Sequence, residues 1–215
     1  MTGVVLAGGS SGRMGGPKHL LVLGGRTLLE RAVSRLRPVV GRVVIAGGCE
    51  AAVLSDAAED ILKDTFPSGG PLAGIHAALA ATGDTCAVVG CDMPFFSPGL
   101  LTLMEREMGD ALVAVPKVGP YLEPLHAVYR PECSRHIRAL FEEVCAAVTQ
   151  AGGPGQIRRP RVTDLFSRVK VHVTLEDAIR KFGDPRTIFF NINEPGDYEA
   201  ALQALDRAPD PGNPS

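Results

Sequence analysis

The segment from Val4 to Lys18 reads Val-Val-Leu-Ala-Gly-Gly-Ser-Ser-Gly-Arg-Met-Gly-Gly-Pro-Lys, a short apolar run that passes directly into a glycine-rich loop. The β-branched residues and the glycines that stop them predict a buried strand over residues 4–7. Five glycines among residues 8–18 let the backbone approach a ligand closely and point successive N–H groups at an anion. Arg13 and Lys18 add the positive charges that a triphosphate needs. This stretch therefore predicts a strand followed by a phosphate-binding loop.

Two familiar phosphate-binding motifs do not match the spacing of this loop. A P-loop places Gly-Lys-Ser or Gly-Lys-Thr five residues after its first glycine, but Arg13 stands five residues after Gly8, and His19 follows Lys18. The dinucleotide pattern Gly-x-Gly-x-x-Gly is absent from the loop as well. A flexible turn remains the alternative interpretation, although a strand, a glycine loop and two basic residues in succession favour a phosphate site.

Length and composition indicate one globular domain. A chain of 215 residues fits one domain, because single hydrophobic cores grow up to about 250–300 residues. The net charge of −2 offers no positive field for nucleic acid or for an anionic membrane, so we expect neither as a partner. The N-terminus lacks the basic and apolar segments of a signal peptide, and no run approaches the ~18 apolar residues of a membrane span, so we expect a cytoplasmic protein. The cysteines, at positions 49, 86, 91, 133 and 145, form no Cys-x-x-Cys pair, and we expect all five to be reduced and structural.

Downstream of the loop, short apolar runs alternate with stretches of helical spacing. The pattern predicts strands over residues 4–7, 43–46, 59–64, 86–91, 111–115, 124–129, 169–173 and 189–193. It predicts helices over residues 28–36, 72–81, 98–108 and 175–181, and a last one from residue 195. This alternation is typical of an α/β fold, a Rossmann-like three-layer α/β/α domain with a mostly parallel central sheet, which we expect over residues 1–207. Residues 152–160 are expected to form a mobile loop, and residues 208–215 a disordered tail.

Ligands of such sheets bind at the carboxyl ends of the parallel strands, which places the segments after Ala7 and after Cys91 along one rim. The second of these segments reads Gly90-Cys91-Asp92-Met93-Pro94-Phe95. The carboxylate of Asp92 suits Mg²⁺, a hard cation that prefers carboxylate and phosphate oxygens. A helix cap is the alternative role for Asp92, but Ser97, followed by Pro98, already fills that position.

The two segments together resemble the signature of nucleotidyltransferases that couple a nucleoside triphosphate to a phosphorylated acceptor. Leu-Ala-Gly-Gly, followed by Arg-Met-Gly and a downstream lysine, is similar to the molybdenum cofactor guanylyltransferase (MobA) family, whereas relatives that use CTP more often carry Leu-Ala-Ala-Gly. The Cys-Asp-Met-Pro-Phe string also resembles that family, in which the aspartate holds the metal. The resemblance implies catalytic roles for Arg13, Lys18 and Asp92, with Asp92 as the Mg²⁺ ligand. It implies nucleotide binding by Leu6, Ala7, Gly8, Gly9, Gly12 and Lys18.

Further segments resemble the same family. Asp64 stands six residues before the run Gly70-Pro71-Leu72-Ala73-Gly74-Ile75, and in the family an aspartate before this run contacts the nucleotide. Gly74, early in a helix, costs about 0.8–1.0 kcal/mol relative to alanine, so we expect close packing or ligand approach there. Phe190-Asn191-Ile192-Asn193-Glu194-Pro195 resembles the family's Phe-x-Asn-x-Asn-Thr-Pro element; on a strand, the amides of Asn191 and Asn193 would face one side and suit a pterin. Strand-end and capping roles are the alternative for these two asparagines. The run Glu123-Pro124-Leu125-His126-Ala127-Val128-Tyr129 is also similar to the family, on the acceptor side.

The resemblance implies that the protein uses Mg²⁺ to transfer GMP from GTP to (molybdenum-)molybdopterin, with release of pyrophosphate and formation of the guanine dinucleotide cofactor. A molybdopterin cytidylyltransferase, another nucleotidyltransferase such as a sugar-nucleotide synthetase, and a non-catalytic GTP-binding regulator remain alternatives. An enzyme that hands on a labile cofactor is also expected to dock with other proteins of molybdenum cofactor synthesis.

The sequence departs from the family pattern at several places. Many family members have a guanine-contacting asparagine after the second strand, where this chain reads Ala46-Gly47-Gly48. Glu194 replaces the usual threonine. Arg158, Arg159 and Arg161 lie in a segment that is longer than expected, where they meet either the acceptor phosphate or solvent.

Overall fold

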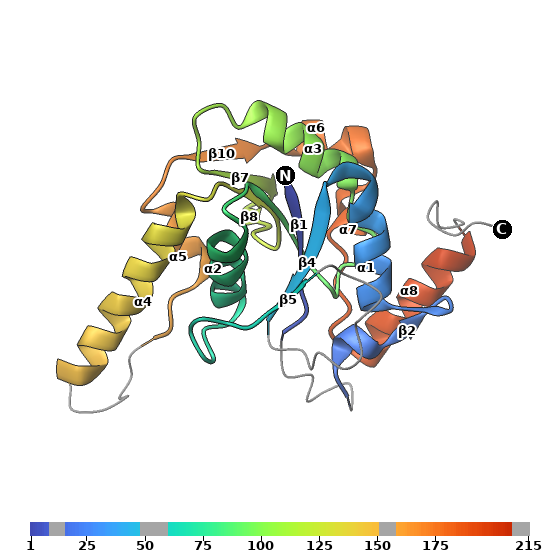
Figure 1. Cartoon of the computed structure of the whole chain (residues 1–215). Coiled ribbons are helices and arrows are strands. Elements are labelled where there is room, and N and C mark those ends of the chain that lie inside the picture. Colours follow the sequence, from blue (N-terminus) through green and yellow to red (C-terminus); the bar gives the residue numbers. More distant parts are fainter. Residues whose placement is uncertain (9–15, 48–59, 151–157, 208–215) are drawn as a thin grey trace.

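The central layer of the protein is a mixed β-sheet (Figure 1). The computed structural model describes residues 1–8, 16–47, 60–150 and 158–207, and within them the sheet has the order β10-β7-β9-β6-β1-β4-β5, with β8 paired to β7. Its strands are β1 (Thr2–Leu6), β4 (Arg42–Ala46), β5 (Asp60–Leu62), β6 (Cys86–Gly90), β7 (Val113–Val118), β8 (Tyr121–Leu122), β9 (His126–Tyr129) and β10 (Val171–Thr174). β1 pairs in parallel with β4 and β6, β4 with β5, and β7 with β10, whereas β9 runs antiparallel to β6 and β7. The predicted, mostly parallel sheet is therefore confirmed.

Alternate residues of the central strands enter two separate cores, one on each face of the sheet. One core takes Val5 and Ile45 and lies beneath α1 (Leu28–Leu36), α3 (Pro98–Glu107), α6 (Glu176–Ile179) and α7 (Pro185–Ile188). The other takes Val4 and Val44 and lies beneath α2 (Pro71–Thr82), α4 (Cys133–Gln150) and α5 (Val162–Phe166). A strand buried on both faces needs an uninterrupted apolar run, which explains why residues 4–7 are all apolar. The result is the three-layer arrangement expected from the sequence (Figure 1).

A third, smaller core joins an N-terminal hairpin to the C-terminal helix. β2 (Val22–Leu23) and β3 (Arg26–Thr27) pair across Gly24 and Gly25, whose φ values of 59° and 79° suit a two-residue hairpin turn. Leu23 packs with Ile192 in the segment that precedes α8 (Pro195–Arg207). The hydroxyl of Tyr198 donates a hydrogen bond of 2.6 Å to the carbonyl of Val22. The C-terminal segment is thereby held next to the part of the chain that follows the glycine-rich loop.

Helix starts follow local sequence signals. The hydroxyl of Ser97 accepts a hydrogen bond of 3.3 Å from the N–H of Leu100, and Pro98 is the first residue of α3, as predicted. α1 begins with a capping box, in which Thr27 and Glu30 each satisfy a backbone N–H of the other. None of the described helices is long and apolar enough to cross a membrane.

The prediction of a strand over residues 189–193 is wrong. These residues are irregular and connect α7 to α8. Phe189 enters the core beneath α1, whereas Ile192 enters the small third core. The N–H of Ile192 donates to the carbonyl of Asp92 at 2.9 Å, so this segment is tied to the loop after β6 by a single backbone bond.

Other predictions shift or fall outside the described residues. α4, α5 and the β2–β3 hairpin were not expected from the sequence, and the helix predicted over 175–181 is α6 followed by a short 3-10 turn, Arg180–Phe182. Cys86, Cys91 and Cys133 are buried, Cys145 is exposed, and these four described cysteines form no disulfide. Position 49, most of the loop predicted over 152–160 and the tail 208–215 lie outside the described residues.

Candidate active site

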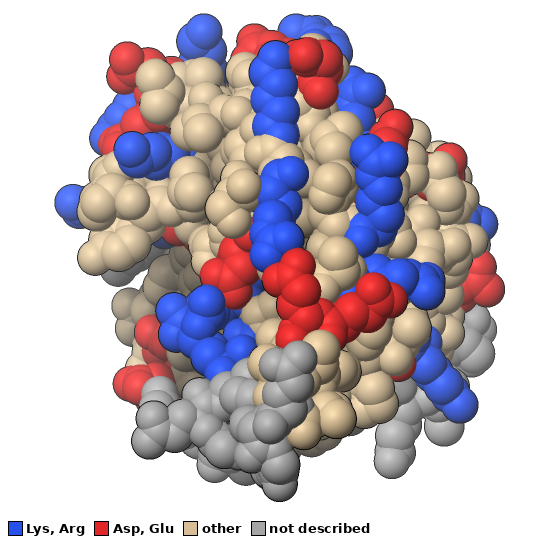
Figure 2. Space-filling model, turned by 90° about the vertical axis from the view of Figure 1, so that its left-hand side faces the viewer, with Lys and Arg blue, Asp and Glu red and all other residues tan. Residues whose placement is uncertain are grey.

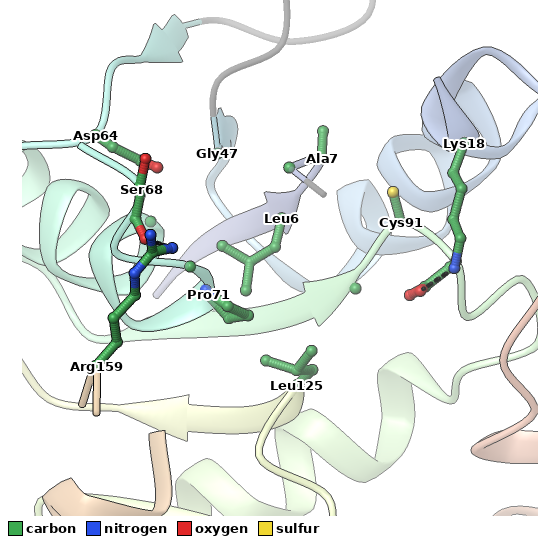
Figure 3. Close-up of a pocket in the computed structure, with 15 residues that line it drawn as sticks. Leu6, Ala7, Lys18, Gly47, Asp64, Ser68, Pro71, Cys91, Leu125 and Arg159 are labelled. Carbon is green, nitrogen blue, oxygen red and sulfur yellow. Dashed lines mark hydrogen bonds and ion pairs between the residues drawn. The ribbon is translucent and has the colours of Figure 1, made fainter. Parts of the chain in front are cut away.

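A cavity of about 630 Å³ opens at the carboxyl ends of β1, β4 and β6 (Figure 3). This is the edge at which parallel sheets bind their ligands. Its described lining comprises Leu6, Ala7, Gly8, Lys18, Gly47, Asp64, Ser68, Gly70, Pro71, Gly74, Gly90, Cys91, Asp92, Leu125 and Arg159. Seven of the residues predicted to bind nucleotide or metal are in this set, namely Leu6, Ala7, Gly8, Lys18, Asp64, Gly74 and Asp92. The topology therefore brings together residues that lie far apart in the sequence.

One end of the cavity carries a lysine beside a carboxylate. The Nζ atom of Lys18 lies 3.5 Å from Asp92 Oδ2 and donates a hydrogen bond of 2.6 Å to Asn193 Oδ1. Asn193 is held in turn by its own N–H, which donates to Asp197 Oδ2 at 2.8 Å at the start of α8. The C-terminal segment thus positions the lysine, which is a role that the sequence pattern alone did not indicate.

The carboxylate of Asp92 folds back against the end of β6. A Cβ built on Gly90 would lie only 2.7 Å from Asp92 Oδ1, so glycine is required if the carboxylate is to keep this place. No group of three His, Cys, Asp or Glu side chains that could hold a metal exists among the described residues. A single carboxylate still fits Mg²⁺, because this ion binds through one or two carboxylates and completes its coordination with substrate phosphates and water.

The other end of the cavity also carries one acidic and one basic side chain, Asp64 and Arg159. Asp64 follows β5, and its Oδ1 is buried without a hydrogen-bond partner among the described residues. Burial raises the pKa of this carboxyl above its usual value. Arg159 approaches from the segment before α5, and its Nη1 donates a hydrogen bond of 2.7 Å to the carbonyl of Ser68. Figure 3 shows Asp64, Ser68 and Arg159 on one side of Leu6 and Ala7, and Lys18 on the other.

Close backbone approach explains two of the glycines at the site. A Cβ on Gly8 would lie 2.2 Å from the carbonyl oxygen of Gly47, so the loops after β1 and β4 can meet only without a side chain there. A Cβ on Gly74 would lie 2.9 Å from Leu6 Cδ2, so α2 packs closely on β1 at this glycine, and a larger residue would have to displace the Leu6 side chain. The close packing that we expected from a glycine early in a helix is therefore present.

Several sequence-predicted site residues stand elsewhere or are not described. The amide of Asn191 donates to the carbonyl of Phe189 at 3.0 Å, and since the segment is not a strand, the strand geometry on which its shared orientation with Asn193 was predicted is absent. Gly9, Gly12 and Arg13 lie outside the described residues. Conversely, Ser68, Leu125 and Arg159 line the cavity without having been assigned to the nucleotide. For Arg159 the only signal in the sequence is the cluster of arginines around it.

His19 lies next to the glycine-rich loop but does not supply charge there at neutral pH. Burial lowers its pKa below 6.5, and a hydrogen bond with the backbone of Ala7 offsets this only in part. The imidazole is therefore neutral at pH 7, and Lys18 is the described cation at this end of the cavity.

A model of one protein family, the MobA-like NTP transferase domain, matches residues 3–156 of the chain. The chain belongs to this family. As a MobA-like protein it is a nucleotidyltransferase, which confirms the resemblance seen in the sequence. Its relatives include a "Probable molybdenum cofactor guanylyltransferase" of Pelotomaculum thermopropionicum, with 39% identity over 93% of this chain and 91% of the relative. A protein of the same name from Natronomonas pharaonis is 34% identical over 95% of this chain and 98% of its own length.

Solved structures of MobA-like proteins have the same fold. The crystal structure of molybdopterin-guanine dinucleotide biosynthesis protein A from Archaeoglobus fulgidus superposes with a TM-score of 0.79 and 28% sequence identity. The match covers 96% of this chain and 100% of that one. The fold similarity therefore extends beyond residue 156, over the C-terminal segment that carries Asn193 and Arg159.

Proposed function

We propose that this protein transfers the GMP moiety of GTP to molybdopterin, releasing pyrophosphate and forming molybdopterin guanine dinucleotide. The observation that carries the proposal is the cavity with Lys18 beside Asp92, in a MobA-like chain that matches relatives named "Probable molybdenum cofactor guanylyltransferase" over nearly their full length. A cavity of about 630 Å³ is of the size that small-molecule sites have, roughly 300–1,000 Å³.

The reaction is an in-line displacement at the α-phosphorus of GTP. A terminal phosphate oxygen of the acceptor forms a new bond to this phosphorus, and the bond to the oxygen that bridges the α- and β-phosphorus breaks. Pyrophosphate leaves with the electron pair of that bond. The attacking phosphate is already ionised at neutral pH, so no side chain has to remove a proton. Catalysis then consists of positioning and charge stabilisation.

Lys18 supplies fixed positive charge at the phosphate end of the cavity. Its ammonium group neutralises the charge that gathers on the leaving pyrophosphate, and Asn193 positions it through the 2.6 Å hydrogen bond. The backbone around Gly8 holds the phosphates, and we propose that Gly9, Gly12 and Arg13 complete this loop.

Asp92 would hold Mg²⁺ at the same end of the cavity. When bound there, the ion supplies positive charge against the phosphate oxygens. Asp92 also keeps Lys18 in place at 3.5 Å, so the lysine is positioned before substrate arrives. Asp64 and Gly74 lie at the opposite end of the cavity, where the nucleoside would bind.

Pyrophosphate release tests this function. Purified protein, Mg²⁺ and molybdopterin are mixed with GTP or with CTP in parallel, and Lys18→Ala serves as the inactive reference. We expect release with GTP, little with CTP, and a loss of at least about 100-fold in the variant. Release with CTP alone would make the protein a cytidylyltransferase that uses the same site. GTP binding without release in the presence of molybdopterin would instead fit a regulator or another acceptor, and would refute the proposed reaction.

A further inference from the structure

The four charged side chains of the described cavity lining lie two at each end. Lys18 and Asp92 form an ion pair at the phosphate end, and Asp64 and Arg159 lie at the other end (Figure 3). The remaining described lining residues are apolar or small, apart from the hydroxyl of Ser68. A nucleotide whose phosphates lie by Lys18 therefore has its base near a carboxylate and a guanidinium.

Asp64 offers an unused hydrogen-bond acceptor at the base end. Its Oδ1 is buried and has no partner among the described residues, which is costly unless a ligand donates to it. The side chain also lies close to α2, since a Cβ on Gly74 would be 3.7 Å from this oxygen. Asp64 is therefore placed to accept hydrogen bonds from two adjacent N–H groups of a ligand.

Arg159 offers hydrogen-bond donors at the same end, and its guanidinium is already anchored. One N–H is used by the carbonyl of Ser68 at 2.7 Å. Ser68 is the one described non-glycine residue with a positive φ, 59°, a conformation that is uncommon for such residues. A guanidinium has five N–H donors in a rigid plane, so four remain after this anchor. The anchor restricts the guanidinium and leaves donors for a ligand.

We propose that Arg159 selects guanine, by donating to O6 and N7 of the base while Asp64 accepts from N1–H and the 2-amino group. This inference rests on the proposed function, since it assumes that the nucleotide binds with its phosphates at Lys18. A guanidinium matches the O6 and N7 atoms of guanine with two parallel hydrogen bonds. Adenine would place an amino group against Arg159 and a ring nitrogen acceptor against Asp64. Cytosine would present the same mismatch, so both bases would leave buried polar groups unpaired.

The neighbouring arginines do not share this placement. Arg158 pairs with Asp164 at 3.0 Å, and it lines an adjoining groove rather than the cavity itself. On the molecular face that carries α4 and α5, basic and acidic side chains lie interspersed (Figure 2). Arg168, for example, pairs with Glu143 there at 2.7 Å. Arg158 is thus a matched control, an arginine of the same segment that does not reach the cavity.

Direct binding measurements test the proposal without the acceptor. The affinities of GTP, ATP, CTP and inorganic tripolyphosphate are measured by calorimetry for the wild type, Arg159→Ala, Arg159→Lys and Arg158→Ala. We expect Arg159→Ala to weaken GTP binding about 10- to 100-fold, while ATP, CTP and tripolyphosphate change less than about twofold. Arg159→Lys keeps the charge but lacks the planar fork, and should lose most of the preference for GTP. Arg158→Ala should leave all four affinities unchanged.

A modified nucleotide locates the contact on the base. 7-Deaza-GTP lacks the N7 acceptor, so it should bind the wild type more weakly than GTP does. In Arg159→Ala the two nucleotides should bind equally, because the partner of N7 is gone. An equal penalty for 7-deaza-GTP in both proteins would contradict the assignment.

Other outcomes overturn the proposal as clearly. Equal loss of affinity for GTP, ATP, CTP and tripolyphosphate in Arg159→Ala would mean that Arg159 binds phosphate rather than the base. Unchanged GTP binding in an Arg159→Ala variant that melts like the wild type would remove Arg159 from the site. A wild type that does not prefer GTP would refute the selection of guanine. If the wild type binds GTP selectively but releases no pyrophosphate with molybdopterin, the proposed function fails while the role of Arg159 stands.

Discussion

Replacing Gly90 by alanine is expected to disable the site while leaving the fold intact. Gly90 is the last residue of β6 and is not among the described glycines with a positive φ, so its backbone conformation is open to alanine. The new Cβ would lie 2.7 Å from Asp92 Oδ1. The substitution therefore acts on the carboxylate that we propose holds Mg²⁺.

The size of the effect follows from this distance. An ordinary contact with a Cβ begins at 3.4 Å, so the carboxylate oxygen has to move by about 0.7 Å from its 2.7 Å position. The clash is with the end of a rotatable side chain, so the free energy of unfolding should change by less than ~1 kcal/mol. Catalysis is far more sensitive, since a misplacement of about 1 Å can cost roughly 100-fold. We expect kcat/KM to fall about 10- to 100-fold, with a higher Mg²⁺ requirement.

The assay combines pyrophosphate release at varied Mg²⁺ with urea denaturation. Gly41→Ala is the matched control, because a Cβ there meets no atom within 4 Å. The double variant with Asp92→Ala separates displacement of the carboxylate from simple filling of the cavity. If Gly90→Ala acts only through Asp92, it should cost nothing further in the Asp92→Ala background.

Two results would refute this reasoning. Wild-type kcat/KM and Mg²⁺ dependence in Gly90→Ala would show that the carboxylate of Asp92 does not need its present place. A full additional loss in the Asp92→Ala background would show that the new methyl group blocks substrate instead.

Four other substitutions probe the charged and titratable groups of the molecule. Lys18→Met should lower kcat about 10²- to 10³-fold, and Asn193→Ala should lower it less, because asparagine only positions the lysine; equal effects in kinetic assays would contradict this order. Burial raises the pKa of Asp64, so GTP affinity should fall as the pH drops through that raised value and the carboxylate is protonated; calorimetry should show this dependence in the wild type and not in Asp64→Asn. Burial lowers the pKa of His126 to about 3, so the unfolded chain binds more protons than the folded one between that value and 6.5, and stability is lost as the pH falls. Denaturation should show a loss of about 2 kcal/mol between pH 7 and pH 5 from this group, which His126→Gln removes; an equal slope in both proteins would speak against it.

Local signals predicted the framework of the fold and the phosphate end of the site. Val4, Val5 and Leu6 are all apolar because β1 is buried on both faces, and Gly8 follows shortly after the strand's end. Asp92 follows the other central strand, so the parallel pairing of β1 with β6 places it on the same edge. Strand burial and parallel pairing were thus enough to predict Asp92 at the edge where the glycine-rich loop begins, whereas the contact of Lys18 with Asn193 was not predicted.

The segment 189–193 misled because its apolar and polar residues alternate. Alternation predicts a strand only if a neighbouring strand is available, and here the N–H of Ile192 bonds to the loop at Asp92. α4 was missed although its pattern is visible, since Cys133, Ile137 and Phe141 recur at helical spacing and are buried on one face. The wrong strand over residues 189–193 reflects tertiary contacts that override the local pattern. The omission of α4 reflects a helical pattern that is present in the sequence but was not used.

The base end of the cavity could not be predicted from spacing. Arg159 contacts Ser68 across 91 residues of sequence, and its place depends on how α4 and α5 pack on α2. An arginine in a polar segment is solvent-exposed more often than not, so the residue type alone favoured no role. Only the assembled helix layer shows which of the three arginines reaches the cavity.

Transfer of the α-phosphorus is the most direct test of the proposed reaction. GTP radiolabelled at the α-phosphorus is incubated with the protein, Mg²⁺ and molybdopterin, and the products are separated. We expect the label to appear in a product that contains both guanosine and the pterin, and to be lost in Lys18→Ala. Label that stays in GTP, or appears only in free GMP, would contradict guanylyl transfer to the pterin.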